Sequence, residues 1–167
     1  MSTPASTTFP TDLDAAIRAF RAGSFASGDG LMPRGWSDDD WRELFRFTST
    51  RRVTAGDVLI RRGEPDQTLY FVLRGDLEVV VHSSDGLSMG PLTRIGAGSV
   101  LGEQSFFDEK PRSASVWAVG DCEVAAMTPE QYSAFEEASP VLARDLLFAL
   151  GRILAIRLRR TTAKVLG

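Results

Sequence analysis

The sequence contains very few of the side chains on which metal sites and nucleophilic enzymes depend. Its 167 residues include one histidine, His82, and one cysteine, Cys122. A structural zinc site or a cysteine-ligated iron–sulfur cluster takes several thiolates or imidazoles, so one chain of this composition cannot assemble either group. A Ser-His-Asp or Cys-His site would have to use His82, which has no recognisable catalytic motif around it. These shortages weigh against an enzyme, including a cupin-like metalloenzyme, and against a bound metal or cofactor.

Excess positive charge and long apolar runs are also absent. The 19 Lys and Arg residues are outnumbered by 22 Asp and Glu residues, which gives a formal net charge of −3 at pH 7. That balance lacks the basic footprint of a nucleic-acid-binding protein. No apolar run is long enough for a membrane-spanning helix, and the Ser/Thr-rich start lacks the layout of a secretory signal. We therefore expect a cytoplasmic protein that by itself binds neither nucleic acid nor a membrane.

The first fifty residues predict a disordered lead, residues 1–10, followed by a helical extension, residues 11–50. Thr11 offers an N-cap and Gly23 a stop for a first helix. Ser37, followed three residues later by an aspartate, repeats the capping pattern before a second, short helix. The extension could dock on the central part of the chain, on the last helix or on another protein, and the sequence leaves these alternatives open.

Residues 51–127 show the short hydrophobic alternation of β-strands in place of helical spacing. Glycine-containing turns separate the apolar runs at the spacing of an all-β sandwich or jelly roll. The runs rich in Val, Leu, Ile, Phe and Tyr predict strands at 57–61, 68–73, 77–82, 91–95, 113–119 and 122–127.

Residues 128–167 predict two C-terminal helices. Thr128 and Gln131, three residues later, form a capping box, and Pro129 occupies the first helical position. A second start signal at Pro140 opens a proline-free run that would be about 39 Å long as a helix. Apolar and small residues along this run follow alternating four- and three-residue steps, which favours a dimer seam, with packing on the chain's own β domain as the alternative. The predicted seam is Leu147, Gly151, Leu154, Leu158, Thr161 and Val165.

The stretch 98–118 has the elements that suit a small phosphorylated sugar. Gly102 allows close approach of the backbone to a ligand. Glu103 begins a short segment able to form one helical turn, and its carboxylate can accept hydrogen bonds from sugar hydroxyls. The planar fork of Arg112 matches two phosphate oxygens. Each residue alone has an ordinary surface explanation, so the joint spacing carries the functional interpretation.

This stretch resembles the phosphate-binding cassette of the cyclic nucleotide-binding domain family. The resemblance rests on Gly102-Glu103, on Pro111, and on the run Arg112-Ser113-Ala114-Ser115 at the separation found in that cassette. It covers about residues 50 to 165. The fold class that it implies is α+β, an eight-stranded antiparallel β jelly roll with N-terminal helices, a short phosphate-binding helix and a long C-terminal helix.

The resemblance also implies roles for individual residues of the cassette. Glu103, with the Gly102 backbone, is similar to the acceptor of the ribose 2′-hydroxyl. Arg112 is similar to the counter-ion of the cyclic phosphate, helped by the backbone amides of Ser113 and Ala114.

Residues outside the cassette core complete the expected pocket. Val79, Leu92 and Thr93 match β-roll positions that wall the purine and the sugar. Leu101 and Gln104 flank the Gly-Glu pair and are also expected to bind ligand. Gln104 departs from the pattern, because many members have an apolar residue there.

The last part of the chain resembles the dimer helix of activator-type members of the family. In those proteins a pair of hydroxyl residues meets the adenine, and one of the pair reaches across the dimer. Thr161 and Thr162 occupy the place of that pair, and Arg157 is the remaining residue expected at the ligand.

From this resemblance we expect a regulatory or sensor domain that binds cAMP and couples binding to movement of its C-terminal helix. Ser113 is also compatible with cGMP, so the choice of nucleotide stays open. The expected partners are the cyclic nucleotide, a second copy through the C-terminal helix and an unidentified effector protein.

Two alternative functions accompany this interpretation. Activator-type members continue into a helix-turn-helix domain, whereas this sequence stops at Gly167. The first alternative is therefore the sensor half of a CRP/FNR-like transcription regulator whose DNA-binding domain is absent from this chain. The second is a ligand-free scaffold, against which the presence of both Glu103 and Arg112 weighs.

Overall fold

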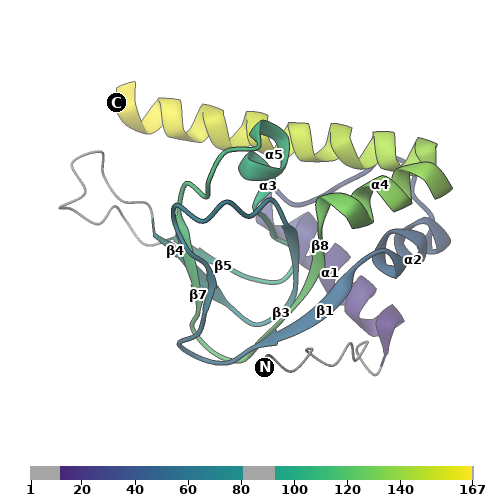
Figure 1. Cartoon of the computed structure of the whole chain (residues 1–167), viewed down its shortest axis with the longest axis horizontal. Coiled ribbons are helices and arrows are strands. Elements are labelled where there is room, and N and C mark those ends of the chain that lie inside the picture. Colours follow the sequence, from purple (N-terminus) through teal and green to yellow (C-terminus); the bar gives the residue numbers. More distant parts are fainter. Residues whose placement is uncertain (1–11, 81–92, 167) are drawn as a thin grey trace.

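Two four-stranded antiparallel sheets form the centre of the computed structural model, which describes residues 12–80 and 93–166 (Figure 1). The first sheet has the order β1 (Ser49–Val53), β8 (Cys122–Met127), β3 (Leu69–Arg74) and β6 (Val100–Leu101). The second has the order β2 (Val58–Ile60), β7 (Ser115–Ala118), β4 (Leu77–Val80) and β5 (Thr93–Ile95). Eight antiparallel strands in two sheets, flanked by helices, confirm the predicted α+β fold class.

Five helices accompany the two sheets in the described part of the chain. They are α1 (Leu13–Ser27), α2 (Asp38–Arg46), α3 (Glu103–Asp108), α4 (Pro129–Ala138) and α5 (Pro140–Leu166). The capping boxes predicted at Ser37 and Thr128 are both formed, each closed by the side chain three residues later. Helix α5 runs along the length of the molecule and passes over α3 and α4 (Figure 1). None of the described helices is long and apolar enough to span a membrane.

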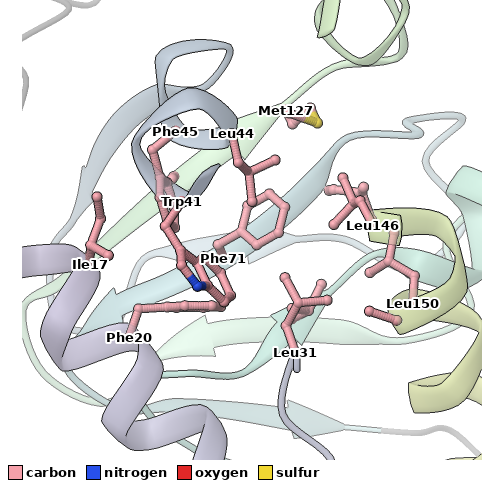
Figure 2. Close-up of a cluster of buried hydrophobic side chains, with 14 of the residues drawn as sticks. Ile17, Phe20, Leu31, Trp41, Leu44, Phe45, Phe71, Met127, Leu146 and Leu150 are labelled. Atoms are coloured by element: carbon pink, nitrogen blue, oxygen red, sulfur yellow. The ribbon is translucent and has the colours of Figure 1, made fainter. Parts of the chain in front are cut away.

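Strand β3 separates two hydrophobic cores, because the side chains of a strand alternate between its faces. Tyr70 and Val72 belong to the core between the two sheets. Phe71 belongs to the core between the first sheet and the helices. There its ring meets Phe20 of α1 and Phe45 of α2 edge-to-face at centroid distances of 6.0 and 5.8 Å (Figure 2). The core that the helices share with the first sheet therefore lies on the outer face of that sheet.

The structure corrects several predicted boundaries. The N-cap of α1 is Asp12, whose side chain accepts a hydrogen bond from the Ala15 amide, while Thr11 lies outside the described residues. Strands β1 and β6 were not among the predicted runs, because β1 contains two arginines and β6 has only two residues. The predicted strands at 77–82 and 91–95 extend into residues that the structure does not describe.

Gly23 does not end α1, as the sequence predicted, because the helix continues to Ser27 and ends at Gly28 in the left-handed conformation. A Cβ on Gly23 would overlap the Ala97 carbonyl oxygen. The glycine is therefore required for close packing of α1 on the turn before β6. The Ser24 hydroxyl reinforces this contact, since it donates a buried hydrogen bond of 2.9 Å to the Gly98 carbonyl.

Replacement of Gly23 by alanine is expected to destabilise the protein by about 2 kcal/mol, because the added methyl group has no room against the Ala97 carbonyl. Helix propensity alone predicts the opposite sign, a gain of about 1 kcal/mol for alanine in an open helix. The measurement is urea unfolding followed by circular dichroism. Gly120→Ala is the control, since no atom of the described residues lies within 4 Å of its added Cβ, and we expect a change within about 0.5 kcal/mol. A more stable Gly23→Ala protein would contradict the packing role.

Candidate functional site

A cavity of about 370 Å³ opens between the second sheet, the segment around α3 and the C-terminal half of α5. This volume lies in the range of small-molecule sites. Its lining combines apolar strand residues with charged groups from the loops and from α5. The lining residues are Asp29, Ile60, Val79, Thr93, Ile95, Leu101, Gly102, Glu103, Gln104, Ser105, Arg112, Ser113, Ala114, Val116, Arg157, Arg160, Thr161 and Lys164.

The apolar side of the cavity is one row of residues across the second sheet. Val79 of β4 is in register with Val116 of β7 and with Thr93 of β5, and Ile60 of β2 continues the row beyond Val116. All four line the cavity. Strand register therefore builds a continuous wall from segments that are far apart in the sequence.

Glu103 lies at the start of α3, directly after a glycine that the local geometry requires. Gly102 has φ +83°, and a Cβ on it would overlap the Arg112 guanidinium and the Thr68 carbonyl oxygen. The Glu103 side chain is only 7% exposed, and its Oε1 accepts a hydrogen bond of 2.7 Å from Arg157 Nη1. A carboxylate at the edge of the cavity is thus held by a cation from the last helix.

Arg112 is a buried cation that joins both ends of the cassette to the start of β3. Its side chain is 2% exposed. Nη2 donates hydrogen bonds of 2.6 Å to Asp66 Oδ2 and to the Thr68 carbonyl, and Nη1 donates one of 3.2 Å to the Gly102 carbonyl. Its Nε is buried and has no hydrogen-bond partner among the described residues. One donor of the guanidinium is therefore unsatisfied beside the cavity.

Asp66 compensates the charge of Arg112. Burial raises the pKa of the Asp66 carboxyl, but hydrogen bonds from Arg112 and Thr68 outweigh that effect and hold the pKa below its ordinary value. The ionised carboxylate is consequently the favoured form in the folded protein.

Arg157 extends from α5 and makes three different contacts. Besides Glu103, it donates a hydrogen bond of 3.0 Å to the Val100 carbonyl and one of 3.1 Å to Asp29 Oδ2. Burial lowers the pKa of this guanidinium, but Glu103 and Asp29 outweigh the burial, so the pKa is raised. Arg157 therefore connects α5 with β6, α3 and the loop after α1.

The structure brings most of the predicted ligand-binding residues together around this one cavity. Ser113 and Gln104 are joined there by a 2.6 Å hydrogen bond from the Ser113 hydroxyl to Gln104 Oε1. The predicted residues that line the cavity are Val79, Thr93, Leu101, Gly102, Glu103, Gln104, Arg112, Ser113, Ala114, Arg157 and Thr161.

Two predicted ligand-binding residues are not placed at the cavity. Leu92 lies outside the described residues. Thr162 is exposed and is not part of the described lining, because successive helical residues are rotated by about 100° and Thr161 is the one that faces inward.

Sequence reasoning missed several lining residues. Val116 could have been predicted, because it lies two positions after Ala114 and therefore on the same face of the predicted strand at 113–119. Asp29 carried no local signal, since the loop after α1 reaches the cavity only through tertiary packing. The other missed lining residues are Ile60, Ile95, Ser105, Arg160 and Lys164.

The two sheets form a β roll around the cavity, with the short helix α3 beside it and the long helix α5 over it. This arrangement is that of a domain that binds a small ligand. The chain matches the family described as "Cyclic nucleotide-binding domain" over residues 50–138, and it belongs to that family. Membership of this family, which the cassette residues predicted, is thereby confirmed. This is a family of binding domains and not of catalysts.

Known relatives and solved structures agree with this assignment. The chain is 35% identical over 127 residues to the cAMP-activated global transcriptional regulator Vfr of Pseudomonas aeruginosa, a match that covers 74% of this chain and 57% of Vfr. The chain spans about half the length of the other curated relatives that it matches.

Among solved structures, the Thermus thermophilus catabolite activator protein is 29% identical with a TM-score of 0.69, covering 79% of this chain and 60% of that chain. A cyclic nucleotide-binding domain from Methylobacillus flagellatus has a TM-score of 0.76 at 22% identity, covering 90% of this chain and 84% of that domain. The latter supports the fold alone.

The Asp66–Arg112 pair makes a pH dependence testable. A lowered pKa in the folded state means that the stabilisation is complete above the unfolded pKa of about 3.9 and is lost as pH falls through the folded value. Stability measured by urea unfolding at pH 6 and at pH 3 is expected to fall less in Asp66→Asn than in the unmodified protein. An equal loss in both proteins would show that Asp66 does not contribute to acid sensitivity.

Proposed function

We propose that this chain binds cAMP and acts as a regulatory domain. The observation that carries the proposal is that Glu103 and Arg112, nine positions apart in the cassette, line one cavity together with an apolar row of the second sheet. A carboxylate suits the ribose 2′-hydroxyl and a guanidinium suits the cyclic phosphate. The relatives named as cAMP-activated regulators support cAMP as the nucleotide.

The charge of the lining supports an anionic ligand. The described lining contains four cations, Arg112, Arg157, Arg160 and Lys164, against the carboxylates of Asp29 and Glu103. The buried Nε of Arg112 lacks a partner among the described residues, and a phosphate oxygen would satisfy it. Ser113 and Ala114 follow Arg112 directly and also line the cavity, and we assign their backbone amides to the phosphate as well.

The apolar row and the hydroxyl of α5 support a purine. Val79, Val116 and Ile60 offer a wall on which the base and the sugar can lie without losing hydrogen bonds. Thr93 belongs to the same row, Leu101 of β6 lines the cavity from the first sheet, and Thr161 supplies a hydroxyl from α5. Gln104, hydrogen-bonded to Ser113, is assigned to the rim of the site.

Coupling of the ligand to α5 follows from the residues of that helix at the cavity. Arg157 and Thr161 line the site, and Arg157 contacts Glu103 directly. A ligand held between the cassette and these residues binds better when α5 is close to the roll. Binding therefore shifts the population toward that arrangement, and α5 carries the signal to an effector.

A second copy of the chain is the proposed partner of α5. The helix exposes an apolar stripe whose largest members are Phe148, 76% exposed, and Leu158, 68% exposed, with Val165 at its end. Steps of three and four residues also bring Gly151 and Thr162 onto this stripe. Leu147 and Leu154 of the predicted seam are half buried, so Phe148 takes the place of Leu147. Thr162 would then face the partner's ligand.

A longer transcription regulator is the second candidate function. The chain spans about half the length of relatives that are named as transcriptional regulators. In that case the same cAMP-dependent movement of α5 would control a DNA-binding domain.

Addition of cAMP is expected to stabilise the protein by about 2.7 kcal/mol at a hundredfold excess over the dissociation constant, because the ligand binds only the folded state. Thermal unfolding and calorimetric titration, each with cAMP and with cGMP, measure the effect and the preference. Absence of any response to millimolar cAMP and cGMP would contradict the proposed function.

The same titration with Arg112→Lys tests the phosphate contact. Lysine keeps the charge but lacks the planar fork, so we expect affinity to fall at least about tenfold. Arg94→Lys, at an exposed position of β5 outside the described lining, is the matched control and should bind like the unmodified protein.

Replacement of Phe148 by glutamate is expected to convert the dimer into a monomer, because the charge would be buried in the proposed seam. Light scattering after size-exclusion chromatography measures the mass. Phe25→Glu is the matched control, since Phe25 of α1 is 78% exposed and lies off the stripe. A monomeric unmodified protein, with and without cAMP, would contradict the dimer, and an unaffected Phe148→Glu dimer would contradict this seam.

A further inference from the structure

The loop that follows α1 supplies a second carboxylate to the cavity. Asp29 Oδ2 lies 3.1 Å from Arg157 Nε and 3.4 Å from Arg160 Nη1, and its side chain is 19% exposed. Asp29 also lines the cavity itself. The N-terminal extension, whose role the sequence left open, therefore reaches the site directly.

Close backbone packing holds this loop in place. Gly28 ends α1 in the left-handed conformation, and a Cβ on Gly30 would overlap the backbone of Ser24. Ser24 is itself bonded to the Gly98 carbonyl, in the turn that leads into β6 and the cassette. The position of Asp29 is thus set relative to β6 and to α3, which begins at Glu103.

Asp29 completes a chain of ionic contacts that ends at Glu103. Arg157 is held by Asp29 through Nε and by the Val100 carbonyl through Nη2, while Nη1 contacts Glu103 Oε1 at 2.7 Å. Two fixed acceptors leave the guanidinium little freedom, because its hydrogen-bond donors lie in one plane. Asp29 and Glu103 are thus joined through one guanidinium, which the Val100 carbonyl also holds.

We propose that Asp29 is a positioning residue of the ligand site, which acts through Arg157 to hold Glu103 ready for a ligand hydroxyl. The proposal rests on the proposed function and assigns the N-terminal extension a part in it. The competing explanation is that Asp29 only fastens α5 to the extension. In that case its effect would not depend on the hydroxyl that Glu103 accepts.

The first test compares cAMP with 2′-deoxy-cAMP, which lacks that hydroxyl. Asp29→Asn is expected to weaken cAMP binding about tenfold and to leave 2′-deoxy-cAMP binding within about twofold of the unmodified protein. Asp29→Glu, which keeps the carboxylate, should recover most of the cAMP affinity. Asp39→Asn is the matched control, since it removes an exposed carboxylate of the same extension that pairs with Arg42 away from the cavity.

The second test is a double-mutant cycle with Arg157→Gln. If Asp29 acts through Arg157, Asp29→Asn has no further effect on cAMP affinity in the Arg157→Gln background, whereas additive effects would overturn the proposal. Equal weakening of both nucleotides, or no weakening of either, would also overturn it. Failure of the unmodified protein to bind cAMP would instead overturn the proposed function, so the two failures are distinguishable.

Discussion

The Arg112 guanidinium is a buried cation, and its partners connect the parts of the site. A charge removed from water is tolerated only if it is paired and hydrogen-bonded. Asp66 supplies the countercharge, and the carbonyls of Thr68 and Gly102 supply acceptors. Gly102 directly precedes α3, Thr68 directly precedes β3, and Arg112 itself lies just before β7. The hydrogen bonds of this one guanidinium therefore hold α3, β3 and the start of β7 together. The cavity beside Arg112 is a consequence of that arrangement.

Helix α5 combines a structural part and a ligand-facing part in one continuous element. Leu146 and Leu150 are buried in the core between the helices and the first sheet (Figure 2). Ile153 is buried in the same core, so this half of α5 is anchored to the first sheet. Beyond them, Arg157 and Thr161 pass over the cavity. An anchored first half gives the second half a defined place from which a ligand can draw it closer or release it. The proposed regulation depends on this division of α5 into an anchored half and a ligand-facing half.

Local patterns predicted much of the fold and the centre of the site. The capping boxes at Ser37 and Thr128 and the alternation in β3 depend on residues within a few positions of one another, so they were readable from the sequence. The stop at Gly23 was wrong because the glycine serves a contact with Ala97, far along the chain. Strand β6 was missed because two residues carry too little pattern.

The sequence by itself determined the cassette, since Gly102, Glu103 and Arg112 lie within one short stretch whose chemistry and spacing are local properties. Only the tertiary structure decided which distant groups act on it. Arg157 reaches Glu103 across 54 positions, and Asp29 reaches Arg157 across 128. Such pairs arise from the packing of α1 and α5 on the roll, because hydrogen bonds and charges act over a few ångströms in space, whatever the separation along the chain.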